Sequence, residues 1–175
     1  MRKLLFALVL LLLLSLNSNA QKLKDINLEK RISLIEDRIA IKNVVDTFSI
    51  LADTKEVDKE VLLFTENATV ETVMNGKPGS PLTGRKQIRD SFTAFLSSFE
   101  LVYHINGQQT VTINTDKAEG ISYCQVTLIG NQNGKKIKTT FGVRYNDDFV
   151  REAGKWLIAK RKSTFLWKDI APMDQ

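Results

Sequence analysis

The chain has 175 residues with 25 basic and 20 acidic side chains, a single histidine and a single cysteine. One cysteine cannot form an internal disulfide bond, and no cysteine or histidine cluster has the spacing of a metal site. Neither a phosphate-binding glycine loop nor a Gly-x-Ser-x-Gly turn is present, and the basic residues form no stripe with stacking aromatic side chains. We therefore expect no metal, no cofactor and no nucleic-acid partner.

The first 20 residues have the pattern of a secretory signal peptide. Arg2 and Lys3 precede an unbroken apolar run from Leu4 to Leu14, and a short polar segment ends at Ala20. We expect cleavage after Ala20, a periplasmic or secreted bacterial protein, and no membrane segment in the mature chain. Residues 21–175 are long enough for one domain with its own core.

The first half of the mature chain predicts three helices. Apolar residues spaced three and four apart predict a long amphipathic helix over about 25–52. A short helix is expected at Lys59 to Phe64, with Asp58 as its N-cap, and a third at 85–99 with Thr83 as its cap.

The remaining segments predict β-strands. A first strand is expected at 68–74, followed by a turn-rich loop at 75–84. The second half predicts an antiparallel meander with a tight turn at Asn133-Gly134. Its four strands are Leu101–Asn114, Lys117–Ile129, Lys136–Val150 and Trp156–Trp167.

These elements together predict an α+β fold, a cone-shaped roll of three N-terminal helices packed on a curved antiparallel sheet. Long strands packed against one long helix tend to curl. A curled sheet with a helix across its mouth encloses a pocket, which suits a small ligand.

The single histidine, His104, lies in the first strand of the meander. Period-two alternation places it with Asn106 on the polar side, opposite Tyr103 and Ile105. One interpretation is a solvent-exposed strand residue, and the other is a polar wall of the pocket. Gly107 could introduce a bulge that changes the register, so the alternation alone leaves both open.

Asp53 ends the first helix, where a carboxylate faces the negative end of the helix dipole. It is either a turn-forming residue or a side chain that points into the cone, where it orients a histidine or acts as a base. Cys124 fits a small buried apolar residue better than a nucleophile, because no second histidine exists to activate it. Trp156 and Trp167 fit a core or an interface.

Several segments resemble SnoaL-like domains, which lie within the nuclear-transport-factor-2-like superfamily. The clearest is "GVRYNDDFVREAGKWLIAKRKSTFLW", residues 142–167, which is similar to the closing hairpin of those domains. "LFTENATV" at 63–70 resembles the block after their second helix, and "GRKQI" at 84–88 resembles the start of their third. The resemblance covers nearly all of residues 21–175 and implies the same cone-shaped fold.

Within that superfamily, the branch of scytalone dehydratase and bacterial bile-acid dehydratases has an Asp at the end of the first helix and a His at the start of the strand after the third. Asp53 and His104 occupy these two positions. The scytalone dehydratase type also has a Tyr before the Asp and a second His in the next strand. Here Ala52 stands at the first of these positions, and Thr127 or Leu128 at the second.

The resemblance implies a small hydrophobic cyclic ligand and a cofactor-independent dehydratase or isomerase that uses Asp53 and His104. We expect Phe48, Tyr123 and Tyr145 to contact that ligand, although most strand tyrosines simply pack. The alternative is a non-catalytic periplasmic module that binds a ligand or dimerises. Apolar and aromatic residues on both faces of the last strands favour a homodimer in either case.

Overall fold

The computed structural model describes the backbone of residues 2–173 and the side chains of residues 27–173. The chain divides into two units, residues 1–38 and 39–175. The first consists of the larger part of helix α1 (Arg2–Asp53), where Leu28, Ile32 and Ile35 are exposed. The expected signal peptide, residues 1–20, lies outside the described side chains, so export stays a prediction. Within the described part, no helix is both long and apolar enough to cross a membrane.

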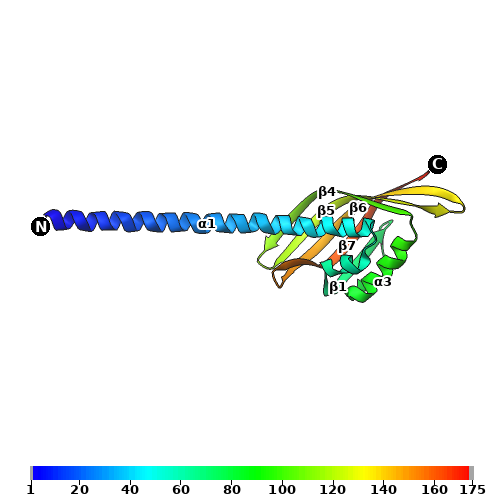
Figure 1. Ribbon diagram of the computed structural model, residues 1–175, viewed down its shortest axis with the longest axis horizontal. Helices are drawn as coiled ribbons and strands as arrows, with labels where there is room; N and C mark the ends of the chain where they lie inside the picture. The colour runs from blue at the N-terminus through cyan, green and yellow to red at the C-terminus, as the bar shows by residue number, and fades with distance from the viewer. Residues whose placement is uncertain (1, 174–175) are drawn as a thin grey trace. The chain divides into compact units, whose positions relative to one another are not determined.

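The second unit contains the last turns of α1, two further helices and the sheet (Figure 1). Helix α2 (Val57–Glu60) is followed by one 3-10 turn, η1 (Val61–Leu63). Together they overlap the helix expected at Lys59 to Phe64, but they begin two residues earlier and end one residue earlier, because Phe64 already begins a strand. The prediction of Asp58 as N-cap was wrong. Glu56 occupies that position without a side-chain cap bond, and Asp58 lies inside α2.

Helix α3 (Gly84–Ser97) agrees with the third expected helix. Thr83 is its N-cap residue, but its hydroxyl makes no cap hydrogen bond. The Thr83 backbone N–H instead donates to Oε1 of Gln87 at 2.7 Å, which ties the first turn of α3 to the chain before it.

One sheet contains all the strands, in the order β2-β1-β7-β6-β5-β4, with β3 paired to β1. The long antiparallel meander is confirmed, but the sheet is mixed, because β1 pairs with β7 in parallel. Asn133 and Gly134 both have positive φ, 54° and 77°, as a two-residue hairpin turn requires. The strands are β1 (Phe64–Met74), β2 (Lys77–Pro78), β3 (Leu82–Thr83), β4 (Leu101–Asn114), β5 (Lys117–Gln132), β6 (Lys135–Glu152) and β7 (Lys155–Pro172).

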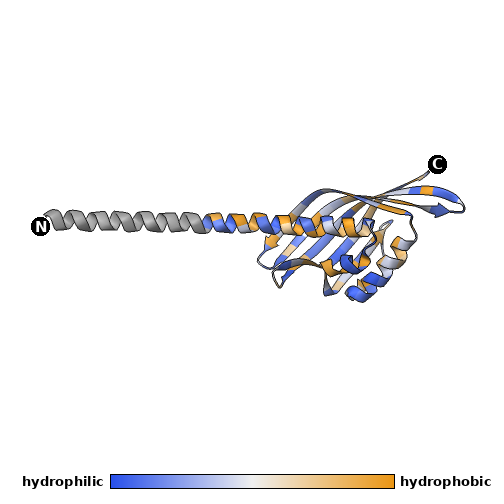
Figure 2. Ribbon diagram, in the orientation of Figure 1, coloured by the Kyte–Doolittle hydropathy of each residue, from blue (hydrophilic) through white to orange (hydrophobic). Residues whose placement is uncertain are grey.

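Apolar and polar residues alternate along the long strands (Figure 2), so one face of each strand packs on the core. The most deeply buried apolar side chains come from α1, β1, α3 and β7, which shows that helices and sheet share one core. They are Ile41, Phe64, Ala68, Ile88 and Ile158. Register shifts between Asn106 and Gln109 and between β6 and β7 interrupt the pairing. Such shifts bend strands, and the result is the expected α+β fold with three helices on a curved sheet.

Replacing Ile158 by Ala should lower the free energy of unfolding by about 2–5 kcal/mol, because it removes buried methyl groups and leaves a cavity. Ile170→Ala on the same strand is the matched control. Ile170 is 54% exposed, so its replacement should change stability by less than about 0.5 kcal/mol. Urea denaturation followed by circular dichroism measures both. Equal losses would mean that the inner face of β7 is assigned wrongly.

Candidate active site

A cavity of about 350 Å³ lies in the second unit, within the size range of small-molecule sites. Most of its lining is apolar, and aromatic rings from α1, α3, the segment directly after α3, β6 and β7 dominate it. These rings belong to Phe48, Phe92, Phe95, Phe99, Phe141, Tyr145 and Phe165. The side chains of Glu60, His104, Arg161 and Lys168, which can carry a charge, also reach the lining. In a mostly apolar cavity, a small number of polar groups fix the orientation of a ligand.

Asp53 holds His104 through two hydrogen bonds. Its Oδ1 lies 2.6 Å from Nδ1 of the imidazole, and its Oδ2 accepts the His104 backbone N–H at 3.2 Å. The His104 side chain is 7% exposed and that of Asp53 24% exposed. His104 is therefore a wall of the cavity and not a solvent-exposed strand residue, and Asp53 lies behind it.

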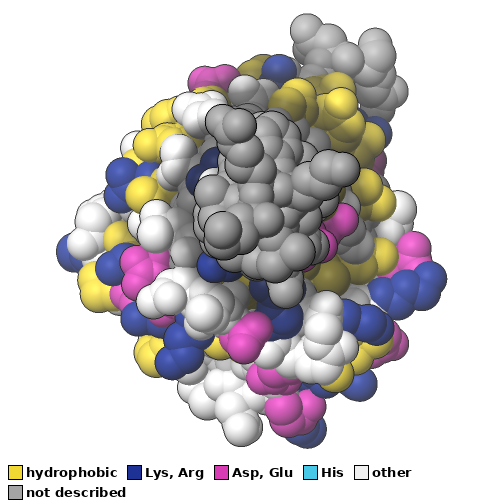
Figure 3. Space-filling view, turned by 90° about the vertical axis from the view of Figure 1, so that its left-hand side faces the viewer, with side chains coloured by type: hydrophobic (Ala, Val, Ile, Leu, Met, Phe, Trp, Pro, Cys, Tyr) yellow, Lys and Arg dark blue, Asp and Glu magenta, His cyan; other side chains and the backbone are white. Residues whose placement is uncertain are grey.

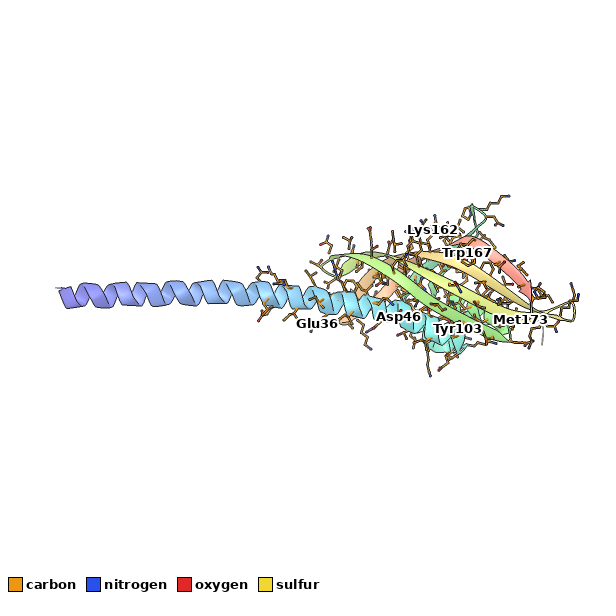
Figure 4. The ribbon with its side chains drawn as sticks, turned by 90° about the horizontal axis from the view of Figure 1, so that it is seen from above. Glu36, Asp46, Tyr103, Lys162, Trp167 and Met173 are labelled. Carbon is orange, nitrogen blue, oxygen red and sulfur yellow. The ribbon has the colours of Figure 1, made fainter. Side chains whose placement is uncertain are left out.

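The contact between α1 and β4 explains this placement. Asn106, two residues after His104, accepts a hydrogen bond from the Ser49 hydroxyl at 3.0 Å and donates one to Oδ1 of Asp46 at 2.9 Å. Figure 4 labels Asp46 on α1 and Tyr103 on the neighbouring β4. Since Asp46, Ser49 and Asp53 recur at helical spacing, one face of α1 follows the strand.

Burial lowers the pKa of His104 from its ordinary value of 6.5, while the hydrogen bond and the charge of Asp53 oppose that shift. The imidazole is therefore neutral at pH 7. A carboxylate only accepts hydrogen bonds, so Nδ1 carries the proton. This leaves the lone pair of Nε2 free to accept a proton.

Arg161, which lines the same cavity, belongs to a buried ion pair. Arg161 on β7 and Asp147 on β6 are directly paired across the two strands, and each side chain is 1% exposed. Nε and Nη2 of Arg161 donate to the two carboxylate oxygens at 2.8 and 2.7 Å. Nη1 is buried and finds no hydrogen-bond partner in the described part of the chain. Asp147 therefore holds the Nε–Nη2 edge of the guanidinium, and Nη1 is the nitrogen without a partner.

Aromatic rings surround this guanidinium. Its carbon lies 4.2 Å from the ring centroid of Phe48 and 4.3 Å from that of Tyr145. Burial raises the pKa of Tyr145, which keeps its hydroxyl protonated, and raises the pKa of the Cys124 thiol to about 11. A thiol with such a pKa is not a nucleophile at neutral pH, as expected for Cys124.

Glu60 is a further ionisable group in the lining. It is the last residue of α2 and is 1% exposed. Burial raises its pKa to about 8, the charge of Asp53 adds to this shift, and the charge of Arg161 opposes it. The carboxyl group is therefore mainly neutral at pH 7. Its Oε2 is buried and has no hydrogen-bond partner among the described residues.

The structure brings four of the five expected site residues together. Phe48, His104 and Tyr145 line the cavity, and Asp53 contacts His104. Tyr123 is the exception, and its expected ligand contact must be corrected. Its side chain lies on the outer face of β5 and is exposed, because the inward face of that strand carries the even-numbered residues.

The sequence did not identify Glu60, Asp147 or Arg161 as site residues. Asp147 could have been found, because it falls within an alternating series of inward residues on β6 that includes Tyr145 and Phe149. Glu60 gives no such signal, since α2 is a single turn.

No group of three or more His, Cys, Asp or Glu suited to a metal comes together within the described range. On the face shown in Figure 3, Lys and Arg side chains are interspersed with Asp and Glu.

The fold and the sequence are both similar to known proteins. An uncharacterised protein of Mycobacterium tuberculosis is 25% identical over 131 residues, which cover 74% of this chain and 86% of that one. A candidate scytalone dehydratase from Novosphingobium aromaticivorans superimposes with a TM-score of 0.68 at 19% identity, over 78% of this chain and 88% of that one. A hexachlorocyclohexane dehydrochlorinase superimposes with a TM-score of 0.67 at 15% identity, over 82% and 93%.

At these identities the two solved structures show a shared fold alone. The sequence model of the SnoaL-like domain family, in contrast, matches residues 33–162 directly. That match spans most of the chain and includes Asp53, His104 and Arg161. The chain therefore belongs to the family of SnoaL-like domains.

Proposed function

We propose that this domain binds a small, mostly apolar cyclic molecule that carries a carbonyl or hydroxyl oxygen, and that His104 removes a proton from carbon in it. The observation that carries the proposal is the 2.6 Å contact between Asp53 and the imidazole at the wall of an apolar cavity. The reaction class is dehydration or isomerisation. The dehydratase and dehydrochlorinase names of two proteins with this fold are consistent with it.

The proton transfer follows from the state of the imidazole. Nε2 takes a proton from carbon next to a carbonyl group, and the positive charge that forms on the ring is stabilised by Asp53. Because Asp53 also binds the backbone of the same residue, the ring is oriented before a ligand arrives. Positioned general-base catalysis of this kind contributes about 10²–10⁴-fold to a rate.

Arg161 is suited to the ligand oxygen. Nη1 is a charged donor without a partner in the described structure, and Arg161 lines the cavity. A carbonyl oxygen placed there would accept this bond, and its growing negative charge during proton removal would be stabilised. Tyr145 stacks on the guanidinium and limits the position of that oxygen.

A direct test of the base uses 5-nitrobenzisoxazole, a flat bicyclic molecule that opens to a coloured phenolate when a base removes its carbon-bound proton. His104→Ala should slow this turnover by about 10²-fold or more, since no other residue replaces Nε2. Asp53→Asn should also slow it, because the amide no longer fixes the tautomer. The rate of colour formation measures both.

Tyr123→Phe is the control, since Tyr123 lies on the outer face of the sheet and should have no effect. Melting temperatures of all variants identify any that fail to fold. A His104→Ala protein that folds and is as fast as the unchanged protein would remove the base from the mechanism.

The same probe predicts a pH dependence. A protonated imidazole cannot accept a proton, so the rate should rise with pH and level off once His104 is neutral. Because burial lowers the pKa of His104 from 6.5, the midpoint of this rise should lie below pH 6.5. A profile of kcat/KM between pH 4.5 and 8 locates it, and a midpoint at or above 6.5 would contradict the assignment.

A second candidate is a homodimer formed through the outer face of the sheet, with or without catalysis. Leu101, Tyr103 and Ile105 of β4 and Tyr123 of β5 are exposed side by side on that face. Paired apolar side chains of this kind are typical of interfaces. Light scattering should give twice the monomer mass for the unchanged protein, and Tyr103→Lys should lower it towards the monomer mass. A monomer at every concentration would exclude this dimer.

A further inference from the structure

Large apolar side chains form an exposed stripe along the first unit. Leu28, Ile32 and Ile35 are 52%, 46% and 57% exposed, and they follow one another at spacings of four and three residues. Figure 2 shows hydrophobic and hydrophilic residues interspersed along this part of α1. On a helix this spacing places the three side chains on one face. A row of large side chains left about half exposed is typical of a surface that associates with a partner.

The spacing of the stripe is that of a coiled coil. In a seven-residue repeat lettered a to g, the apolar core positions are a and d, which are separated alternately by three and four residues. Leu28 and Ile35 then take position d, and Ile32 takes position a. A β-branched residue at a together with leucine at d, as in Ile32 and Leu28, suits a two-stranded coil. The stripe therefore fits one further helix of the same pattern.

The charges beside the stripe select the direction of that second helix. Positions e and g flank the core, and all their residues in this segment are exposed: Glu29 and Glu36 take e, and Arg31 and Arg38 take g. Figure 4 labels Glu36 on α1. In a parallel pair each g position faces the e position five residues later on the other helix, so Arg31 faces Glu36 of the second copy. An antiparallel pair would set acid against acid and base against base.

The same charges argue against a lipid surface as the partner. Helices that lie on a membrane carry an excess of lysine and arginine on their polar face, which attracts anionic lipids. Residues 28–38 contain three basic and three acidic side chains, so the segment has no net charge. Acidic and basic residues sorted onto opposite flanks instead match an identical helix.

We propose that residues 28–38 bind the same segment of a second copy of this chain as a parallel, two-stranded coiled coil. A helix of this length is unstable in water by itself. The segment is part of α1, which continues to Asp53, so the association does not have to nucleate the helix. This interface is separate from the outer face of the sheet, and it is independent of any catalysis by His104.

Disulfide cross-linking tests the direction and the register of the pair. Leu28→Cys and Ile35→Cys, made separately, should each give a disulfide-linked dimer under mild oxidation, because a d position in a parallel pair meets the same position of the second helix. In an antiparallel pair, two positions seven residues apart cannot both meet their own copies. Lys30→Cys is the matched control, since position f points away from the second helix and beyond the reach of a disulfide.

The products are separated on a denaturing gel after free thiols have been blocked. The natural Cys124 is buried and its pKa is raised to about 11, so the unchanged protein should remain unlinked. Because all three replaced residues are exposed, the variants should keep the melting temperature of the unchanged protein.

Cross-linking at both 28 and 35, but not at 30, is the expected result. Cross-linking at only one d position, or equally at 30, overturns the parallel coiled coil. Folded variants that never cross-link overturn the association altogether. If vesicles of phosphatidylserine and phosphatidylcholine bind the unchanged protein and abolish cross-linking, the partner is a membrane and the second copy is excluded.

The flanking charges give a second readout. Glu36→Arg should raise the dissociation constant of the pair about 2–30-fold, because it places two arginines opposite each other at both flanks. Adding Arg31→Glu to the same chain should restore the affinity, while Lys30→Glu at position f should leave it unchanged. All three are made in a Tyr103→Lys chain, so that the outer face of the sheet does not contribute, and sedimentation measures the constants. An unchanged constant in Glu36→Arg, or no recovery in the double variant, would contradict the parallel pairing.

Discussion

The contact of α1 with β4 is the constraint on which the site depends. β4 is the outermost strand of the sheet, with β5 on one side only, and an exposed edge of this length invites pairing with another chain. Side chains of α1 cover part of that edge, and Asp53 accepts the His104 backbone N–H that no strand partner takes. The hydrogen bonds of Asn106 to Ser49 and Asp46 hold the helix in register. The same contact thus protects the edge and orients the imidazole, so the two roles cannot be separated by mutation of Asp53 alone.

The second constraint is the ion pair in the core. Removing one partner of a buried pair typically destabilises a protein by about 3–5 kcal/mol, whereas replacing both by apolar residues is often neutral. By this rule, an apolar pair at positions 161 and 147 is expected to support the fold as well as the ion pair does. What the pair provides is a guanidinium held by Nε and Nη2, with aromatic rings around it and Nη1 left unpartnered. A rigid donor in an apolar setting is more useful to a ligand oxygen than a flexible one.

The fold was largely predictable from the sequence because its signals are local. Alternation and tight turns located all four long strands, and the position of Asp53 at the end of α1 was correct. Alternation correctly separated His104 from Tyr103 and Ile105, but it could not show which side of β4 is buried. The apolar Tyr103 and Ile105 face outward, while the polar His104 faces α1. On β7, strict alternation predicts the wrong inward residue. Trp156 and Ile158 face inward, but the register shift near Asp148 turns Arg161 inward in place of Lys160. Only the paired strand β6 reveals that shift, so the alternation of β7 alone hides it.

Glu60 and Arg161 each bury a polar atom without a hydrogen-bond partner in the described part of the chain, which lowers the stability of the fold. Selection for heat resistance alone favours leucine at 60 and an aliphatic side chain at 161, and proteins commonly gain stability from such replacements at some loss of activity. Such replacements would keep the fold and fill the cavity. These two buried ionisable side chains are therefore the ones that selection for stability alone would remove first.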